Sequence, residues 1–243
     1  QYGLEKMGIL EKDHEKLECF IGPPLQISFA DYYGFNENQC HQAIAFYRER
    51  FIETGMYENE LYKGIIPLLE KLKATGKKLA VATSKPTVFA IEILKYFQIE
   101  DYFDVVAGSE LDGTRSTKAE IIQYVLDEFQ DKTKDSFVMI GDRKHDMIGA
   151  NLTGIDSIGV TYGFGSSEEL EHASATYIVE SIEELEKIND KRKNRLSEAI
   201  LNGDIKGVVT MSFVALLISL LVVVFGVAIL TGIIYLLMKA SKK

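Results

Sequence analysis

Residues 64–179 repeat one pattern, in which a short apolar strand alternates with an amphipathic helix. Strands are expected at 79–82, 105–107, 137–140, 158–160 and 177–179, and helices at 64–75, 86–97, 117–130 and 145–152. Short apolar strands that alternate with helices are typical of a parallel sheet with both faces covered. The sequence therefore predicts an α/β fold, and ligands of such folds bind beyond the carboxyl ends of the strands.

Three further segments flank this pattern. Residues 1–62 show helical periodicity alone, residues 189–206 are rich in charge, and residues 207–238 contain no charged side chain. We therefore predict an α-helical cap at 1–62, an α/β core at 63–188, a charged stalk at 189–206 and a transmembrane helix at 207–238.

The uncharged segment 207–238 is longer than the roughly 20 apolar residues with which a helix crosses a bilayer. Lysine and arginine are more frequent before it than after it, and positive flanks stay on the cytoplasmic side. We therefore expect a single-pass membrane protein that contacts the lipid bilayer through this segment, with its N-terminal domain in the cytoplasm. Ala228 and Gly232 have a spacing of small residues that also permits self-association of such helices.

The charge of the chain excludes one class of partner. Up to Ile188 there are 33 Asp and Glu residues against 19 Lys and Arg residues. An acidic surface repels phosphates, so no nucleic-acid partner is expected. Cys19 and Cys40 form no CxxC motif and are expected to be reduced thiols in the core.

Polar side chains follow two of the predicted strands in positions that suit an anion. Thr83 and Ser84 come between a strand and a helix whose first position suits Pro86. Hydroxyls and free N–H groups at a helix N-terminus can bind an anion, although such residues are also ordinary helix caps. Lys118 begins a later helix, where the helix dipole disfavours a cation. This position suits a lysine that binds negative charge. The alternative is that Lys118 is an ordinary solvated lysine on the surface.

A third strand end carries two acids. The strand at 137–140 leads to Asp142, and Asp146 follows about one helical turn later. Two carboxylates this close repel each other unless a cation lies beside them, and hard oxygen ligands favour Mg²⁺. The alternative is that one of the two acids only caps the following helix.

A hydroxyl, a lysine and an acid pair on successive strand–helix junctions resemble the haloacid dehalogenase superfamily of phosphatases, in particular its phosphoglycolate-phosphatase-like branch with a helical cap. The resemblance covers about residues 1–188. It is carried by IGPPL at 21–25, ATSKP at 82–86, GSELDGTRSTK at 108–118, GDRKHDMIGA at 141–150 and TYGFGSSEEL at 161–170. It implies a Rossmann-like parallel sheet with an α-helical cap, and an Mg²⁺-dependent phosphoric monoester hydrolase that acts through an aspartyl-phosphate.

The resemblance also implies which residues handle the phosphoryl group. Thr83 would donate a hydrogen bond to it, with the backbone of Ser84 beside it, and Lys118 would neutralise its charge. Phosphoryl transfer depends mostly on such positioning and charge neutralisation.

The resemblance further implies a metal site and a contact from the cap. Asp142 would bind Mg²⁺, and Asp146 would support both the metal shell and the lysine. Gly22 and Pro23 of the cap would face the leaving group of a small phosphorylated metabolite.

The nucleophile of this family, an aspartate in a DxDGT motif on the first strand, has no counterpart here. The chain opens within a helix, and the similar segment 110–114 follows a later strand, where the family has a loop. We therefore expect an N-terminally truncated sequence of an active enzyme, whose sheet lacks its central strand and leaves strand edges unpaired. Without the attacking carboxylate we expect no turnover of phosphate esters.

Two functions stay open at this point. One is the Mg²⁺-dependent phosphatase, and the other is a non-catalytic, membrane-tethered binding protein that uses the remaining fold. A phospho-acceptor receiver domain also places Asp, Thr and Lys at strand ends, but there the acids come first. Phosphoglycolate, pyrophosphate, nucleoside monophosphates and sugar phosphates are all candidate substrates.

Overall fold

The computed structural model describes residues 1–13, 15–130, 132–188 and 222–225. Within these residues the core is a parallel sheet with the strand order β2-β1-β6-β3-β4-β5. The strands are β1 (Lys78–Pro86), β2 (Val105–Ser109), β3 (Phe137–Gly141), β4 (Asp156–Val160), β5 (Tyr177–Val179) and β6 (Val222–Phe225). The predicted parallel α/β fold is confirmed, and β1 to β5 lie where the apolar pattern placed them.

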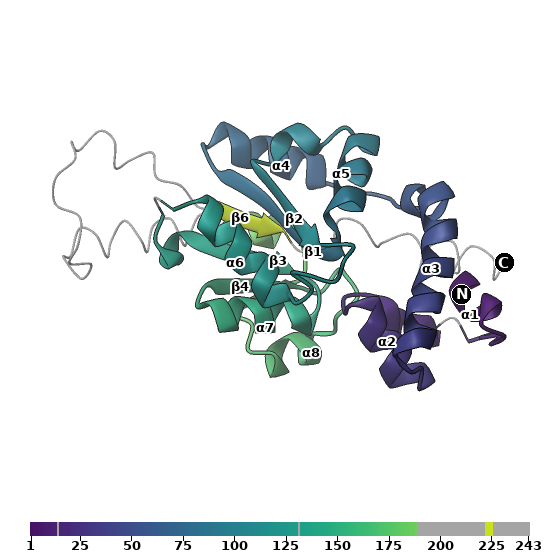
Figure 1. Cartoon of the computed structure of the whole chain (residues 1–243). Helices are drawn as coiled ribbons and strands as arrows, with labels where there is room; N and C mark the ends of the chain where they lie inside the picture. Colours follow the sequence, from purple (N-terminus) through teal and green to yellow (C-terminus); the bar gives the residue numbers. More distant parts are fainter. Residues whose placement is uncertain (14, 131, 189–221, 226–243) are drawn as a thin grey trace, which may run out of the picture.

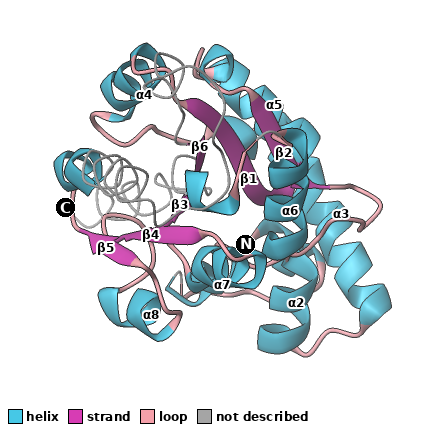
Figure 2. Cartoon of the chain, turned by 90° about the vertical axis from the view of Figure 1, so that its left-hand side faces the viewer, coloured by secondary structure: helices cyan, strands magenta, loops and turns pink. Residues whose placement is uncertain are grey.

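Helices cover both faces of this sheet (Figure 2). They are α4 (Ile65–Ala74), α5 (Thr87–Tyr96), α6 (Lys118–Glu128), α7 (Lys144–Thr153) and the short α8 (Ser167–His172), which the sequence pattern did not predict. Side chains alternate along β1, so Leu79 and Val81 pack in one buried cluster with α4 and α5. Ala80 and Ala82 face the other way and pack with α6 and α7. Both faces of β1 are therefore buried.

The first 62 residues are helical, as predicted. They form α1 (Tyr2–Lys6), α2 (Leu25–Tyr33) and α3 (Glu37–Glu53), with 3₁₀ turns at Glu15–Phe20 and Gly55–Tyr57. Leu4, Phe29, Cys40 and Ala43 form a separate small core, and both cysteines are free thiols. These helices lie to one side of the sheet, and their side chains share a cavity with the loops at the carboxyl ends of the strands (Figure 1).

The position of β6 corrects two expectations. Val222–Phe225 lie between β1 and β3 and pair in parallel with both, so the expected gap in the centre of the sheet is filled. These four residues also belong to the segment 207–238, for which a helix was predicted. The reason for the error is that a short run of valines and phenylalanine also suits a strand, and apolarity alone does not separate a strand from a helix.

The other residues of the predicted membrane segment, including Ala228 and Gly232, lie outside the described residues, as does the predicted stalk 189–206. Among the helices that the structure describes, none combines the length and the apolar character needed to cross a bilayer.

Replacement of Ile121 by alanine tests the packing of α6 on the sheet. The side chain is fully buried, so Ile121→Ala is expected to lower the free energy of unfolding by about 2–5 kcal/mol. Ile148→Ala on α7 is the matched control, because that isoleucine is 43% exposed and its loss should cost less than about 1 kcal/mol. Urea unfolding followed by circular dichroism measures both. Equal losses would contradict this packing.

Candidate active site

Lys118 is a buried residue that joins three elements. Its ammonium lies 2.9 Å from Oδ1 of Asp146 on α7 and donates a 3.0 Å hydrogen bond to the carbonyl oxygen of Ala82 on β1. Only 8% of the residue is exposed. A capping box between Thr117 and Glu120 fixes the start of α6 and so the place from which this side chain extends. The alternative of a solvated surface lysine is therefore excluded.

Asp142 and Asp146 form a pair of buried carboxylates between β3 and α7. Oδ2 of Asp142 accepts a 2.9 Å hydrogen bond from the N–H of Phe164, and Oδ2 of Asp146 accepts one of 3.2 Å from the N–H of Arg143. Burial and the neighbouring Asp146 raise the pKa of Asp142 to about 6. The pair thus lies in surroundings that favour a bound cation or a proton.

Thr83 and Ser84 lie at the carboxyl end of β1, but the structure places them differently. Thr83 is fully buried, and its hydroxyl accepts a 3.1 Å hydrogen bond from the N–H of Lys85. This N–H is therefore occupied, whereas a free one was expected. Ser84 is half-buried and lines the cavity, and its carbonyl oxygen accepts a hydrogen bond from the Ser109 hydroxyl. The structure thus brings Ser84 to the cavity surface and Thr83 beneath it.

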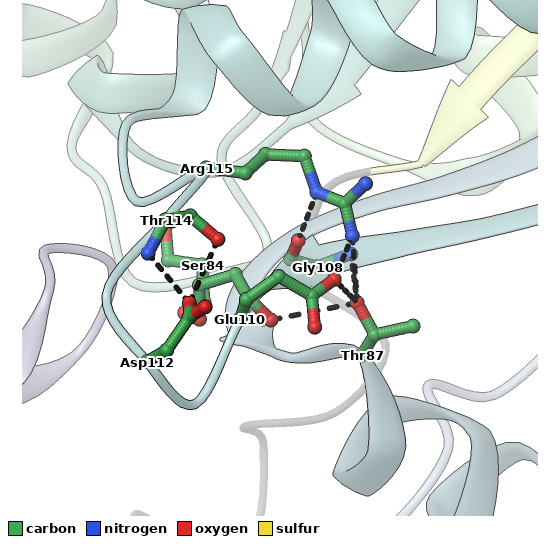
Figure 3. Close-up of polar contacts among 8 residues, drawn as sticks. Ser84, Thr87, Gly108, Glu110, Asp112, Thr114 and Arg115 are labelled. Carbon is green, nitrogen blue, oxygen red and sulfur yellow. Dashed lines mark hydrogen bonds and ion pairs between the residues drawn. The ribbon is translucent and has the colours of Figure 1, made fainter.

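The loop after β2 is tied to the start of α5 (Figure 3). Arg115 donates hydrogen bonds to the carbonyl oxygen of Gly108 and to the hydroxyl of Thr87, and it forms an ion pair with Glu110. Gly108 is required here, because a Cβ at this position would lie 2.1 Å from the carbonyl oxygen of Lys85. These contacts fix the loop that leads into Lys118.

The segment 110–114 in this loop resembles the nucleophile motif in sequence but not in its place in the fold. Asp112 is exposed and accepts hydrogen bonds from the N–H and the hydroxyl of Thr114, at 2.9 and 2.7 Å. These bonds lower the pKa of Asp112. Its carboxylate therefore belongs to the turn itself (Figure 3).

Most of the predicted site residues line one cavity of about 770 Å³. Its lining includes Ser84, Lys118, Asp142 and Asp146 from the core, and Gly22 and Pro23 from the cap. Thr83 alone among the predicted residues does not line it.

Arg143 connects this site to the cap, a contact that sequence reasoning missed. Its guanidinium donates a 2.6 Å hydrogen bond to the carbonyl oxygen of Ile21 and pairs with Glu169 at 2.9 Å. Gly22, at φ +107°, packs against the Arg143 side chain. Arg143 and Glu169 lie in the family motifs at 141–150 and 161–170. Residue type alone, however, does not predict the hydrogen-bond partners of a side chain.

The carboxylate pair fits a magnesium ion. Both oxygens of Asp146 are engaged, by Lys118 and by the N–H of Arg143, and Oδ2 of Asp142 accepts from Phe164. Among the described residues Oδ1 of Asp142 has no hydrogen-bond donor from another residue, so it can serve as a metal ligand. Within the described residues no group of three or more His, Cys, Asp and Glu side chains forms a complete metal cage. Mg²⁺ does not need one, because it keeps several waters and binds one or two carboxylates plus phosphate oxygens.

Asp142→Asn should stabilise the metal-free protein at pH 8, by about 1–3 kcal/mol. In the wild type the pKa of Asp142 is raised to about 6. Ionisation of this carboxyl therefore lowers the free energy of unfolding as pH rises towards and through that value. The gain should therefore disappear as pH falls from 6 to 4, where the wild-type carboxyl takes up its own proton. Thermal unfolding across this range measures the effect, and added Mg²⁺ should stabilise the wild type alone. A variant less stable than the wild type at pH 8 would contradict the burial argument.

Lys118→Met tests the buried ion pair. Removing the ammonium leaves the Asp146 carboxylate buried and unpaired, which should cost about 3–5 kcal/mol in the free energy of unfolding. The double variant Lys118→Met with Asp146→Asn removes the orphaned charge as well and should recover at least half of that loss. Denaturant unfolding of the three proteins measures the coupling, and purely additive losses would show that the two groups do not interact.

The sequence profile described as haloacid dehalogenase-like hydrolase matches residues 1–160. A protein of Pseudomonas aeruginosa named 5'-nucleotidase is 48% identical over 177 residues, which are 73% of this chain and 80% of that protein. The tyrosine-protein kinase PtkA of Mycobacterium tuberculosis is 34% identical over 178 residues, and the chain spans 60% of its length.

A solved structure and a further relative are also described as phosphatases. The crystal structure of a predicted phosphatase from Clostridium acetobutylicum is 49% identical, with a TM-score of 0.75 over 78% of this chain and 88% of that one. A phosphoglycolate phosphatase of Vibrio parahaemolyticus is 26% identical over 168 residues, 69% of this chain and 73% of that protein. The chain therefore belongs to the haloacid dehalogenase-like hydrolase family, within its phosphoric monoester hydrolases.

Proposed function

We propose that this chain carries the magnesium- and phosphate-binding part of a phosphatase that acts through an aspartyl-phosphate. One observation supports the proposal above all: Lys118, Asp142 and Asp146 line the same cavity beyond the strand ends. A cation, two acids and a serine loop in this arrangement suit charge neutralisation of a phosphoryl group.

Each site residue has a role in this proposal. Lys118 holds the negative charge of the phosphoryl group, and Asp146 holds the Lys118 ammonium in place from the opposite side. Ser84 orients the phosphoryl oxygens from the end of β1, and Thr83, beneath the cavity surface, holds the backbone of that strand end through the N–H of Lys85. Asp142, with Asp146 behind it, holds Mg²⁺, which when bound supplies further positive charge to the phosphate. Gly22 and Pro23 face the leaving group from the cap.

The missing component is an attacking carboxylate. In the described part of the chain the strand between β1 and β3 is β6, Val222–Phe225, and the sequence from there to Lys243 contains no Asp or Glu. A metal and a lysine cannot replace a nucleophile. We therefore propose that these 243 residues bind phosphate esters without hydrolysing them until a strand with an aspartate is supplied. The same observation favours the second candidate function, a non-catalytic phosphate-binding protein.

The substrate is proposed to be a small phosphorylated metabolite. The relatives suggest two classes, since one is named 5'-nucleotidase and others phosphoglycolate phosphatase. A cavity of about 770 Å³ has room for either. A membrane location with the domain in the cytoplasm, and self-association, stay proposals from the sequence. A helix through Val222–Phe225 is not part of them, because these residues form β6.

An added N-terminal strand that ends in Asp-x-Asp-Gly-Thr and takes the place of β6 between β1 and β3 tests the assignment. The extended protein is expected to hydrolyse p-nitrophenyl phosphate with Mg²⁺ and to stop when the metal is chelated. Lys118→Ala and Asp142→Ala should each lower kcat at least 100-fold, because each removes charge that acts on the phosphoryl group. Asp112→Asn is the matched control and should keep the full rate, since that carboxylate is bound within its own turn. Unchanged rates in the first two variants would refute the site.

A further inference from the structure

Lys85 is a cation in the cavity that the proposed chemistry does not use. It directly follows Ser84, lines the same cavity and is half-buried. Its ammonium lies 4.5 Å from the centre of the Phe51 ring on α3 of the cap. Burial lowers the pKa of Lys85 to about 8, so the ammonium still carries its charge at neutral pH.

Three other cations that line this cavity already have anionic partners. Lys118 pairs with Asp146, Arg143 with Glu169, and Arg50 with Glu58. By contrast, among the described residues no carboxylate or other acceptor reaches the Lys85 ammonium, whose contact is the face of an aromatic ring. A half-buried ammonium without an acceptor is costly, and a bound anion would relieve that cost.

The carboxyl end of β1 holds the backbone of Lys85 in a fixed position. Its N–H is bound to the Thr83 hydroxyl at 3.1 Å, and its carbonyl oxygen packs against Gly108, where a side chain would not fit. The ammonium therefore extends from a fixed backbone, one residue beyond Ser84, which is proposed to contact the phosphate. Rigid presentation lowers the entropic cost of binding a ligand.

The aromatic wall beside Lys85 is not free to stack on a base. Tyr47 stacks on Phe51 at 5.2 Å, the ring of Phe89 meets Phe51 edge-on at 5.4 Å, and the ammonium of Lys85 lies over the ring. The part of the cavity beside Lys85 and Phe51 therefore presents a positive charge to a ligand, and the Phe51 ring has no free face. This part suits an anionic group better than a nucleobase.

We propose that Lys85 is a specificity residue that binds a second anionic group, a carboxylate or a second phosphate, of a small phosphomonoester. The inference rests on the proposed function, because Lys118 and the acid pair with Mg²⁺ would bind the first phosphate. Lys85 then selects substrates by the charge at their other end.

Titration calorimetry of the full 243-residue chain with Mg²⁺ tests this proposal. The ligands are 2-phosphoglycolate, ethylene glycol bisphosphate and ethyl phosphate, which carry a carboxylate, a second phosphate and no second charge. Lys85→Met keeps an unbranched side chain that can still pack on Phe51. It should weaken binding of at least one doubly anionic ligand about 10- to 100-fold, as expected for a lost charge-assisted hydrogen bond, and should leave ethyl phosphate unchanged. Whichever of the two ligands loses affinity identifies the second group.

Two further variants complete the design. Lys85→Arg keeps the charge and should retain most of the discrimination, and Lys95→Met, on the exposed side of α5, should change nothing. Equal weakening of all three ligands by Lys85→Met would mean that Lys85 binds the first phosphate, and the proposal would be wrong. Equal affinity of the wild type for all three ligands would also overturn it. If ethyl phosphate does not bind even to the wild type, the proposed function itself fails.

Discussion

The ammonium of Lys118 is shared between a carboxylate on α7 and a backbone carbonyl on β1, and the site is arranged around that contact. Burial of an ion pair has a large desolvation cost, which is offset only when every charged atom finds good partners. Here Oδ1 of Asp146 takes the lysine and Oδ2 takes the N–H of Arg143. One buried contact thus fixes α6, α7 and the end of β1 relative to one another before any ligand arrives.

This arrangement leaves negative charge in excess. Two buried carboxylates face one buried ammonium, and the nearby guanidinium of Arg143 is directed to Ile21 and Glu169. The carboxylate left over is Asp142, and burial together with the neighbouring Asp146 raises its pKa. Such a group weakens the empty fold and strengthens it when a cation binds, so binding and stability are coupled through the same atoms.

The sequence predicted what depends on local pattern. The alternation of strands and helices placed β1 to β5, and the strand ends placed Lys118, Asp142 and Asp146 at one edge. It did not predict β6, because pairing with β1 and β3 depends on contacts with residues more than eighty positions away. The burial of Thr83 and the contact of Lys85 with Phe51 were missed for the same reason, since neither has a local signature.

The cap and the phosphate site are not independent. The carboxyl end of β1 contacts the cap through Lys85 and Phe51, and the loop after β3 contacts it through Arg143 and Ile21. A cation–π contact contributes about 0.5–2 kcal/mol and a charged hydrogen bond about 1.5–3 kcal/mol, which is small beside the core. Because these two segments also carry Ser84 and Asp142, a ligand that shifts either segment acts on the cap through the same contacts. Under the proposed function, substrate selection by the cap is therefore coupled to phosphate binding.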